Sequence, residues 1–349
     1  MTQPLQQIVG LLISAHEAKA SDLHLTVGSA PMMRVHGTLQ PVGEVLLTAD
    51  ETLSMVNALL SDEQQERFNK MGEIDFSYEL EGQSRYRVNA YRQRGRVSVA
   101  ARTIPTQIPT LEQLQLPTIL RSLAQKPQGL VLVTGPTGSG KSSTLAAMID
   151  FINRNEKKHI VTLEDPIEYL HSHQASIIDQ REVGADTLSF ANGLRAALRQ
   201  DPDVILVGEM RDLETISAAV TAAETGHLVF ATLHTTDAPQ TIDRIIDAFP
   251  GHQQAQIRTQ LAAVLVAVIS QRLFPLANGR GRACAAEIMI NTPAVGNLIR
   301  TEKVHQIKST MQTGRQYGMI TLEMAIQELL QTGAINAQAA KAYFAEVGG

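Results

Sequence analysis

The sequence predicts an α/β protein in which a short α+β domain precedes a larger domain built on a parallel sheet. Three observations lead to this prediction. Short runs of alternating apolar and polar residues recur within the first hundred residues, as in half-buried antiparallel strands. Four later runs are almost wholly apolar, as in strands that a parallel sheet buries on both faces. The length of 349 residues suits two domains and an appendage.

The composition argues against several classes of protein. The net charge of −5 and the isoelectric point near 6.1 argue against a bulk nucleic-acid binder. Cys284 is the single cysteine, which excludes an intramolecular disulfide and an all-cysteine zinc site. No apolar run reaches membrane-spanning length, and the amino terminus lacks the features of a signal peptide. We therefore expect a cytosolic protein.

The first domain is expected to span residues 1–103. Thr48 or Asp50 is the expected N-cap of its second helix, and Arg94-Gly95 and Glu81-Gly82 are turn signals. The predicted elements are helices in 1–20 and 50–70 and strands at 21–28, 74–80, 85–92 and 96–103. A histidine in the first strand, His24, is expected to be structural rather than a ligand.

A linker is expected at residues 104–117, where Pro105, Pro109 and Pro117 give a semi-rigid stretch with few charges. The nucleotide-binding core should follow at 118–275 and begin with a helix at 119–124. A last strand at 286–290 and a helical tail should complete the chain at 276–349. The tail helices are expected at 293–300, 302–312, 321–331 and 336–346.

The core contains a phosphate-binding loop in its required context. The apolar run Leu130–Val133 leads into the turn Gly135–Ser142, which has the spacing G-x-x-x-x-G-K-S and opens an apolar helix. Glycines allow backbone N–H groups to surround phosphate oxygens, while Lys141 should reach the β- and γ-phosphates and Ser142 should ligate Mg²⁺. ATP and Mg²⁺ are the predicted cofactors. The predicted nucleotide ligands are Gly135, Pro136, Thr137, Gly138, Ser139, Gly140, Lys141, Ser142 and Ser143.

Three more apolar strands each end in polar residues. They are 160–163, followed by Glu164, Asp165 and Glu168; 204–208, followed by Glu209; and 228–233, followed by His234. Because ligands bind at the carboxyl ends of strands in such sheets, these groups should converge on the phosphate-binding loop. Asp212, which follows Glu209 closely, is expected to be a helix cap.

Each of these groups has an expected role. Glu209 fits the Walker B carboxylate, which orients the attacking water and balances Mg²⁺. Glu164, Asp165 and Glu168 could hold metal-bound water or polarise the nucleophile, and His234 could bond the γ-phosphate. The expected metal ligands are Ser142, Asp165 and Glu209. We expect His227 to serve packing at a helix end and His171 and His173 to lie at the surface.

The last strands of the first domain are rich in arginine. Arg85, Arg87, Arg92, Arg94, Arg96 and Arg102 lie in a stretch without an acidic residue. Three interpretations stay open: a solvated sheet face, arginines that reach the γ-phosphate of a neighbouring subunit, and nucleic-acid binding. The third is weakened by an aromatic content of 4% with no tryptophan, since aromatic side chains provide stacking platforms.

Four motifs in order resemble those of the secretion-ATPase superfamily that serves type II secretion and type IV pili. They are G-P-T-G-S-G-K-S, T-L-E-D-P-I-E, D-P-D-V-I-L-V-G-E-M-R-D and G-H-L-V-F-A-T-L-H-T. The chain is most similar to the pilus retraction ATPases, because its amino-terminal domain is single and short and no four-cysteine zinc insertion is possible.

The resemblance implies a PAS-like first domain, a RecA-like second domain and a homohexamer in which Arg87 and Arg102 act in trans. It also implies an Mg²⁺-dependent ATPase that drives pilin depolymerisation and twitching motility. The implied location is cytoplasmic, at the inner membrane beneath the pilus, with the inner-membrane platform protein as partner and no direct contact with nucleic acid.

One segment departs from the retraction pattern. Residues 294–301 read A-V-G-N-L-I-R-T against the signature A-I-R-N-L-I-R-E, so that Gly296 replaces an arginine and Thr301 a glutamate. This leaves open an accessory or divergent retraction paralogue. Two further alternatives are a ring translocase on nucleic acid and a non-motor regulator that binds nucleotide.

Overall fold

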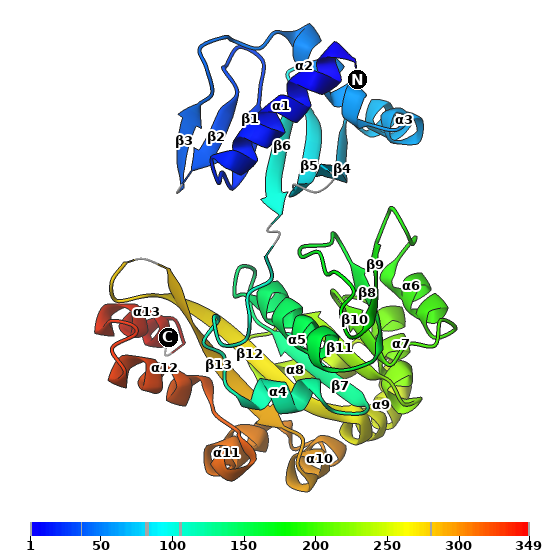
Figure 1. Ribbon diagram of the computed structural model, residues 1–349. Helices are drawn as coiled ribbons and strands as arrows, with labels where there is room; N and C mark the ends of the chain where they lie inside the picture. The colour runs from blue at the N-terminus through cyan, green and yellow to red at the C-terminus, as the bar shows by residue number, and fades with distance from the viewer. Residues whose placement is uncertain (1, 36, 81–83, 105–106, 280, 348–349) are drawn as a thin grey trace. The chain divides into compact units, whose positions relative to one another are not determined.

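The chain forms two compact units, Met1–Gln107 and Ile108–Gly349, each described here by itself (Figure 1). The computed structural model describes residues 2–35, 37–80, 84–104, 107–279 and 281–347. The expected turn at Glu81-Gly82 and the expected linker residue Pro105 lie outside these ranges.

The first unit is a six-stranded sheet covered on one face by helices. Its strand order is β3-β2-β1-β6-β5-β4, with antiparallel neighbours throughout. The strands are β1 (Asp22–Leu25), β2 (Met32–Val35), β3 (Thr38–Pro41), β4 (Glu73–Leu80), β5 (Ser84–Gln93) and β6 (Arg96–Ile104). The helices are α1 (Gln3–Glu17), α2 (Ala49–Leu59) and α3 (Asp62–Met71). Ile8, Leu12, Met55 and Phe68 of the helices meet the apolar strand face in one buried cluster.

The predicted single helix over 50–70 is wrong, because the chain breaks between two capped helices. Thr48 caps α2 and Ser61 caps α3, each in a capping box whose third helical residue bonds back to the cap. Leu60 is extended at the break. The short strands β2 and β3 were not predicted.

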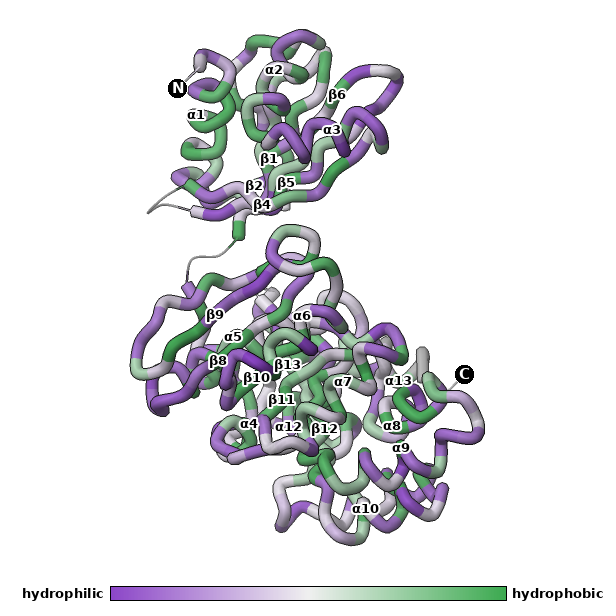
Figure 2. The backbone as a smooth tube through the Cα atoms, turned by 90° about the vertical axis from the view of Figure 1, so that its right-hand side faces the viewer, coloured by the Kyte–Doolittle hydropathy of each residue, from purple (hydrophilic) through white to green (hydrophobic). Residues whose placement is uncertain are grey.

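The second unit is the expected α/β domain, with a seven-stranded sheet in the order β13-β12-β7-β11-β10-β8-β9. The first core strands are β7 (Gly129–Thr134), β8 (His159–Glu164), β9 (Ile177–Glu182), β10 (Val204–Val207) and β11 (Leu228–Leu233), and β12 (Leu265–Pro275) and β13 (Arg282–Ile290) complete the sheet. All neighbours are parallel except β12 and β13. Apolar clusters lie on both faces, and Figure 2 shows the apolar segments gathered inside this unit. This is the RecA-like core that the family resemblance implied.

Helices pack on both faces of this sheet and form the tail. They are α4 (Ile119–Ala124), α5 (Lys141–Asn155), α6 (Phe190–Ala197), α7 (Leu213–Glu224), α8 (Ala238–Asp247), α9 (Gly251–Val264), α10 (Pro293–Arg300), α11 (Ile307–Thr313), α12 (Leu322–Gln331) and α13 (Ala337–Val347), with 3₁₀ turns at Val304–Gln306 and Arg315–Tyr317. The expected tail helices are confirmed, apart from the 3₁₀ turn that precedes α11. Among the described residues, no helix has the length and apolarity needed to cross a bilayer.

Two strands of the second unit were not predicted. β12 follows directly on α9, so that one apolar run at 261–269 ends a helix and begins a strand. β9 is an edge strand whose residues are mostly polar. In addition, Leu111 and Leu116, expected within the linker, are buried in the core of the second unit.

Tyr86 on β5 ties the first unit's sheet to α1. Its side chain is fully buried, and its hydroxyl donates to the carbonyl of Leu12 at 2.6 Å and lies 3.0 Å from the Ser84 hydroxyl. The hydroxyl is therefore a satisfied polar group inside an apolar core, and its removal takes away one buried hydrogen bond to Leu12 and one from Ser84.

We predict that Tyr86→Phe lowers the free energy of unfolding by about 1–2 kcal/mol. Urea unfolding followed by circular dichroism measures the change. The matched control is Tyr78→Phe, which removes the hydroxyl of the half-buried tyrosine opposite Tyr86 on β4 and should change stability by less than about 0.5 kcal/mol. Equal effects of the two substitutions would mean that the Leu12 contact does not stabilise this unit.

Candidate active site

The phosphate-binding loop is held by a close backbone approach. Gly135 has φ +140°, and a Cβ built on it would lie 2.4 Å from the carbonyl oxygen of Gln271 on β12. Gly140, with φ +93°, precedes α5 and provides no side-chain cap. The first N–H groups of α5 therefore remain available to an anion, which is the arrangement that binds phosphate.

Lys141 begins α5 and turns its ammonium group back onto the loop. Its Nζ donates to the carbonyls of Gly135 at 2.8 Å and Pro136 at 3.1 Å. Burial lowers the pKa of this ammonium, while the carboxylates of Glu209 and Glu168 oppose that shift. The ammonium group therefore lies beside the loop. Its positive charge is not fully neutralised by these carboxylates, so it can bind a phosphate.

A pocket of about 410 Å³ opens at the carboxyl ends of β7, β8, β10 and β11. The predicted residues that line it together are Thr137, Gly138, Lys141, Ser142, Glu164, Asp165, Glu168, Glu209 and His234. Other predicted residues lie elsewhere in the loop: the Ser143 hydroxyl bonds that of Tyr169 at 2.8 Å, Ser139 is buried, and Pro136 lines a second cavity. The three strand ends that the sequence singled out therefore do meet at one site.

Glu209, just after β10, pairs with two side chains, Arg211 and His234. Its Oε1 accepts from Arg211 Nε at 2.7 Å and lies 2.9 Å from His234 Nε2. Burial alone would raise the pKa of Glu209, but Arg211, His234 and Lys141 outweigh it and hold the pKa below its usual value. Glu209 is therefore an ionised anchor that positions His234 at the pocket.

Glu164, at the end of β8, lies in the opposite electrostatic environment. Burial raises the pKa of its carboxyl, although hydrogen bonds from Thr162 at 2.7 Å and Gln180 at 3.2 Å favour the charged form. The nearby charge of Glu168 adds to the increase. A carboxylate with a raised pKa accepts a proton more readily, so Glu164 suits a general base while Glu209 stays ionised.

Gln180 on β9 is a site residue that the sequence analysis missed. Its Nε2 donates to Glu164 Oε1 and to the carbonyl of Tyr169 at 2.8 Å, and its Oε1 accepts the backbone N–H of His171 at 2.8 Å. One side chain thus fixes both Glu164 and the loop that carries Glu168. The segment 177–182 has only two apolar residues, so it was not recognised as a strand. The polar side chain of Gln180 within it was the one signal that the sequence offered for a site residue here.

The other histidines are also placed by the structure. His171 lines the pocket rather than the surface, and burial lowers the pKa of its ring to about 4. His173 is exposed, as expected. The His227 ring lies 2.9 Å from the carbonyl of Ala222 at the end of α7, in agreement with the packing role.

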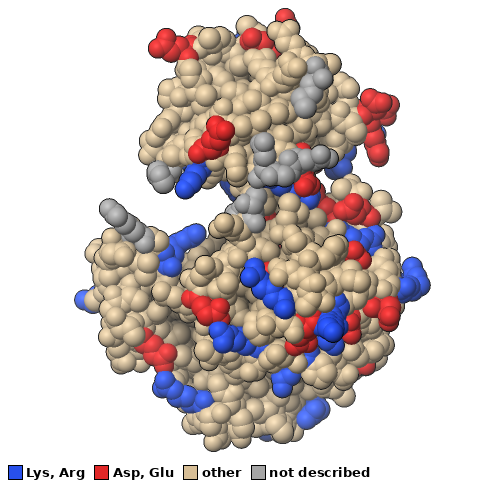
Figure 3. Space-filling view, in the orientation of Figure 1, with Lys and Arg blue, Asp and Glu red and all other residues tan. Residues whose placement is uncertain are grey.

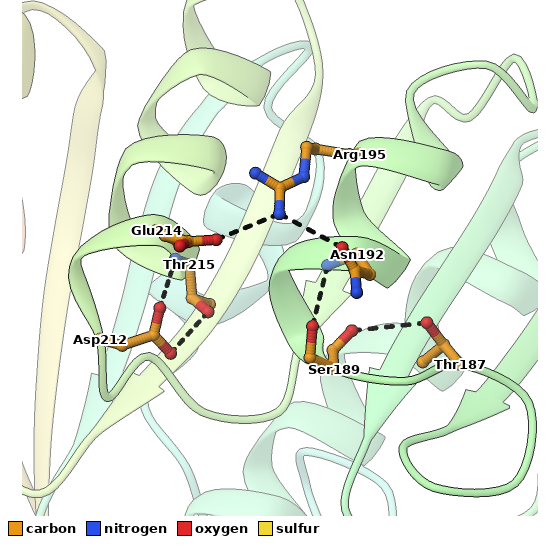
Figure 4. Close-up of polar contacts among 7 residues, drawn as sticks. All are labelled: Thr187, Ser189, Asn192, Arg195, Asp212, Glu214 and Thr215. Carbon is orange, nitrogen blue, oxygen red and sulfur yellow. Dashed lines mark hydrogen bonds and ion pairs between the residues drawn. The ribbon is translucent and has the colours of Figure 1, made fainter.

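The helices beside the pocket are fixed by their caps (Figure 4). Asp212 accepts from the backbone N–H and the hydroxyl of Thr215, which confirms it as the N-cap of α7. Ser189 caps α6 by accepting the N–H of Asn192. Arg195 then joins the two helices through Glu214 at 3.1 Å and Asn192 at 3.2 Å. Ser189 and Asp212 both line the pocket, so this network fixes part of its wall.

The arginines proposed to act in trans belong to the first unit. Arg87 and Arg102 are cross-strand partners on β5 and β6, and both are exposed. Arg102 Nε lies 3.0 Å from Asp22 Oδ1, and Arg87 Nε lies 4.0 Å from Asp75 Oδ1. The lining residues of the pocket all come from the second unit. Both arginines are therefore paired on a sheet face within their own unit, and their role in trans stays a prediction.

The donor set suits a magnesium ion that is held mainly by substrate. Within the described ranges, no cluster of three or more His, Cys, Asp or Glu side chains could hold a metal. Ser142, Asp165 and Glu209 nevertheless line the pocket beside the phosphate-binding loop. Mg²⁺ in nucleotide sites takes few protein ligands and completes its shell with phosphates and water, so these residues fit that ion.

Residues 3–345 match the protein-family model described as type II/IV secretion system protein. The chain is 48% identical over 96% of its length to the type IV pilus retractation ATPase PilT of Pseudomonas aeruginosa and covers 97% of that protein. It is 43% identical over 94% of its length to the type IV pilus ATPase PilU of the same bacterium and covers 86% of it. A crystal structure of the pilus retraction motor PilT with bound ADP matches at a TM-score of 0.90 and 46% identity, with 95% of each chain covered.

We predict that Gln180→Leu lowers kcat for ATP hydrolysis about tenfold, the effect of about 1.4 kcal/mol in the barrier. Loss of the donor raises the pKa of Glu164 further. Because a base must be ionised and activity falls as pH drops through its pKa, the acidic limb of the rate profile should move to higher pH. Steady-state kinetics across pH measures both effects.

The control is Asp179→Asn on the same strand, where the carboxylate pairs with His159 at 3.0 Å and does not line the pocket. It should leave the acidic limb in place. An unshifted limb in Gln180→Leu would show that Gln180 does not position the base.

We predict that Lys141→Ala abolishes ATP turnover, because the phosphates lose their main side-chain counterion.

Glu209→Gln should bind ATP but hydrolyse it very slowly, since it removes the charge that holds His234 and leaves the phosphate-binding loop intact. Fluorescent-nucleotide binding and phosphate release measure the two steps. Turnover near that of the native chain in either variant would contradict the assigned roles.

Proposed function

Since the chain belongs to the type II/IV secretion system protein family, we propose that this ATPase is a motor that retracts type IV pili. The observation that most strongly supports this proposal is the similarity to the retraction ATPase PilT over 96% of the chain, together with an intact nucleotide pocket. In the cell, the motor works in the cytoplasm at the inner membrane beneath a pilus, against the inner-membrane platform protein.

ATP is hydrolysed by in-line attack of water on the γ-phosphate. Lys141 and the N-terminal N–H groups of α5 bind the phosphates, and Glu164 accepts the proton of the attacking water. His234, held by Glu209, contacts the γ-phosphate and senses its loss. Ser142, with Asp165 and Glu209, would hold Mg²⁺, which would supply neutralisation of phosphate charge.

The direct test is genetic. Deletion of the gene in its own host should abolish twitching motility and increase the number of surface pili, because assembled pilin is no longer withdrawn. The native gene should restore both properties and the Lys141→Ala gene neither. Normal twitching and normal pilus counts in the deletion strain would contradict the proposal.

A reduced but persistent retraction in the deletion strain would favour the accessory paralogue. The similarity to PilU and the divergent segment 294–301 keep that candidate open. In the structure, Val295 and Ile299 of this segment are buried in the core of the second unit. Gly296 is also buried, and a Cβ there would lie 3.3 Å from Asn291 Oδ1, so a side chain at 296 requires Asn291 to shift.

A nucleic-acid translocase is a weaker candidate. On the face of the second unit shown in Figure 3, Lys and Arg side chains lie among Asp and Glu rather than forming a basic stripe. Stimulation of ATP hydrolysis by DNA or RNA, with a steep dependence on salt, would support this candidate.

We predict a homohexamer whose sites are completed by Arg87 and Arg102 of a neighbouring subunit. An Arg102→Ala chain and a Lys141→Ala chain should each be inactive alone, and mixing them should restore part of the ATPase activity, because one interface then regains both halves. Light scattering should give the hexamer mass, six times 38.0 kDa.

The matched control for the mixing experiment is Arg94→Ala, which removes an exposed arginine at the turn between β5 and β6 and should stay active alone. No recovery despite demonstrated subunit exchange would leave Arg102 as a surface residue.

A further inference from the structure

Glu287 is a buried carboxylate outside the nucleotide pocket. It lies on β13, opposite Ser270 of β12, and its side chain is 2% exposed. The Ser270 hydroxyl accepts from that of Thr134, the last residue before the phosphate-binding loop, at 2.9 Å. Burial raises the pKa of the Glu287 carboxyl to about 7. A charge-bearing group in such a position needs compensation from its surroundings.

Two helix N-termini provide that compensation. Oε1 of Glu287 accepts the backbone N–H of Ala238, the first residue of α8, at 2.9 Å. Oε2 accepts the backbone N–H of Leu322, the first residue of α12, at 3.3 Å. These donors have no partner within their own helices, and the positive ends of both helices favour a carboxylate between them. One side chain thus joins two helices that are far apart in the sequence.

The first of these helices is firmly attached to the segment that carries His234. The Thr235 and Thr241 hydroxyls lie 2.7 Å apart, and the Thr236 hydroxyl donates to Gln240 Oε1 at 2.9 Å. Both contacts join the residues after His234 to the first turn of α8. The segment that follows His234 is thus linked to the start of α8 by two side-chain contacts.

The second helix belongs to the tail. Ile320, just before α12, exchanges two backbone hydrogen bonds with Ile288, which fixes the entry of α12 beside Glu287. Leu322 and Ile326 of α12 pack in one apolar cluster with Tyr343 of α13. The Arg272 guanidinium lies over the Tyr343 ring at 4.8 Å. The start of α12 and the last helix of the described chain thus share one packed cluster.

We propose that Glu287 is a positioning residue that couples the His234 segment to the C-terminal helices, so that the state of the γ-phosphate changes the position of α12 and α13. The inference rests on the proposed sensing of the γ-phosphate by His234. It gives the tail a mechanical connection to ATP turnover through a carboxylate that does not line the nucleotide pocket.

The test is amide hydrogen exchange of the full chain with Mg²⁺ and either ADP or a non-hydrolysable ATP analogue. In the native chain, exchange should differ between the two nucleotides both at the start of α8 and in the first turn of α12. In Glu287→Gln, which keeps the shape but replaces one accepting oxygen by a donor group, the difference at α8 should persist and that at α12 should be lost.

Glu323→Gln is the matched control. Glu323 is the second residue of α12 and pairs with Lys308 of α11 at 2.6 Å, so its carboxylate is engaged away from α8. The control should retain the difference at α12. If Glu287→Gln does not fold, Glu287→Asp keeps the charge but is too short to reach both helices, and it should lose the difference in the same way.

Three results would overturn the proposal: no nucleotide-dependent exchange at α12 in the native chain, an undiminished difference at α12 in a folded Glu287 variant, or failure of both variants to fold, which would make Glu287 a structural residue. The experiment does not involve pili. A chain that binds nucleotide and shows the coupling but drives another machine would contradict only the proposed function.

Discussion

The approach of the phosphate-binding loop to β12 is the constraint on which the site depends. Gly135 leaves the space that the Gln271 carbonyl occupies, and the Thr134 and Ser270 hydroxyls bond beside it. These contacts fix where β7 ends and α5 begins, and therefore where the phosphate must lie. The carboxyl ends of β8, β10 and β11 are then placed around that position by the parallel register of the sheet.

Two glutamates at these strand ends show how environment separates the roles of identical side chains. Glu209 lies beside the cations of Arg211 and Lys141, which help to keep its pKa low, whereas Glu164 is held in a buried position where its pKa is raised. Glu287 gives a third case, since the backbone N–H groups at two helix N-termini donate to its carboxylate. The same carboxylate can therefore anchor a sensor, accept a proton or join two helices, according to what donates to it.

The sequence was informative wherever one local pattern determined the structure. Mainly apolar runs located β7, β8, β10 and β11, and the loop motif located Lys141 and Ser142, because burial on both faces and phosphate binding each impose a local pattern. β9 was not predicted, because an edge strand needs little apolar surface, and Gln180 was therefore not recognised as a site residue. Glu287 was not predicted for a different reason. Its partners Ala238 and Leu322 are brought to it only by tertiary packing, which no local pattern encodes.

The central claim is that the ends of three strands act together on the γ-phosphate at the loop. A crystal structure of the chain with Mg²⁺, ADP and tetrafluoroaluminate, which imitates the phosphoryl group in flight, tests it most directly. The account predicts Lys141 and His234 within about 3 Å of the fluoroaluminate, and a water between it and the Glu164 carboxylate. A fluoroaluminate bound at the loop with Glu164 and His234 turned away from it would contradict the account.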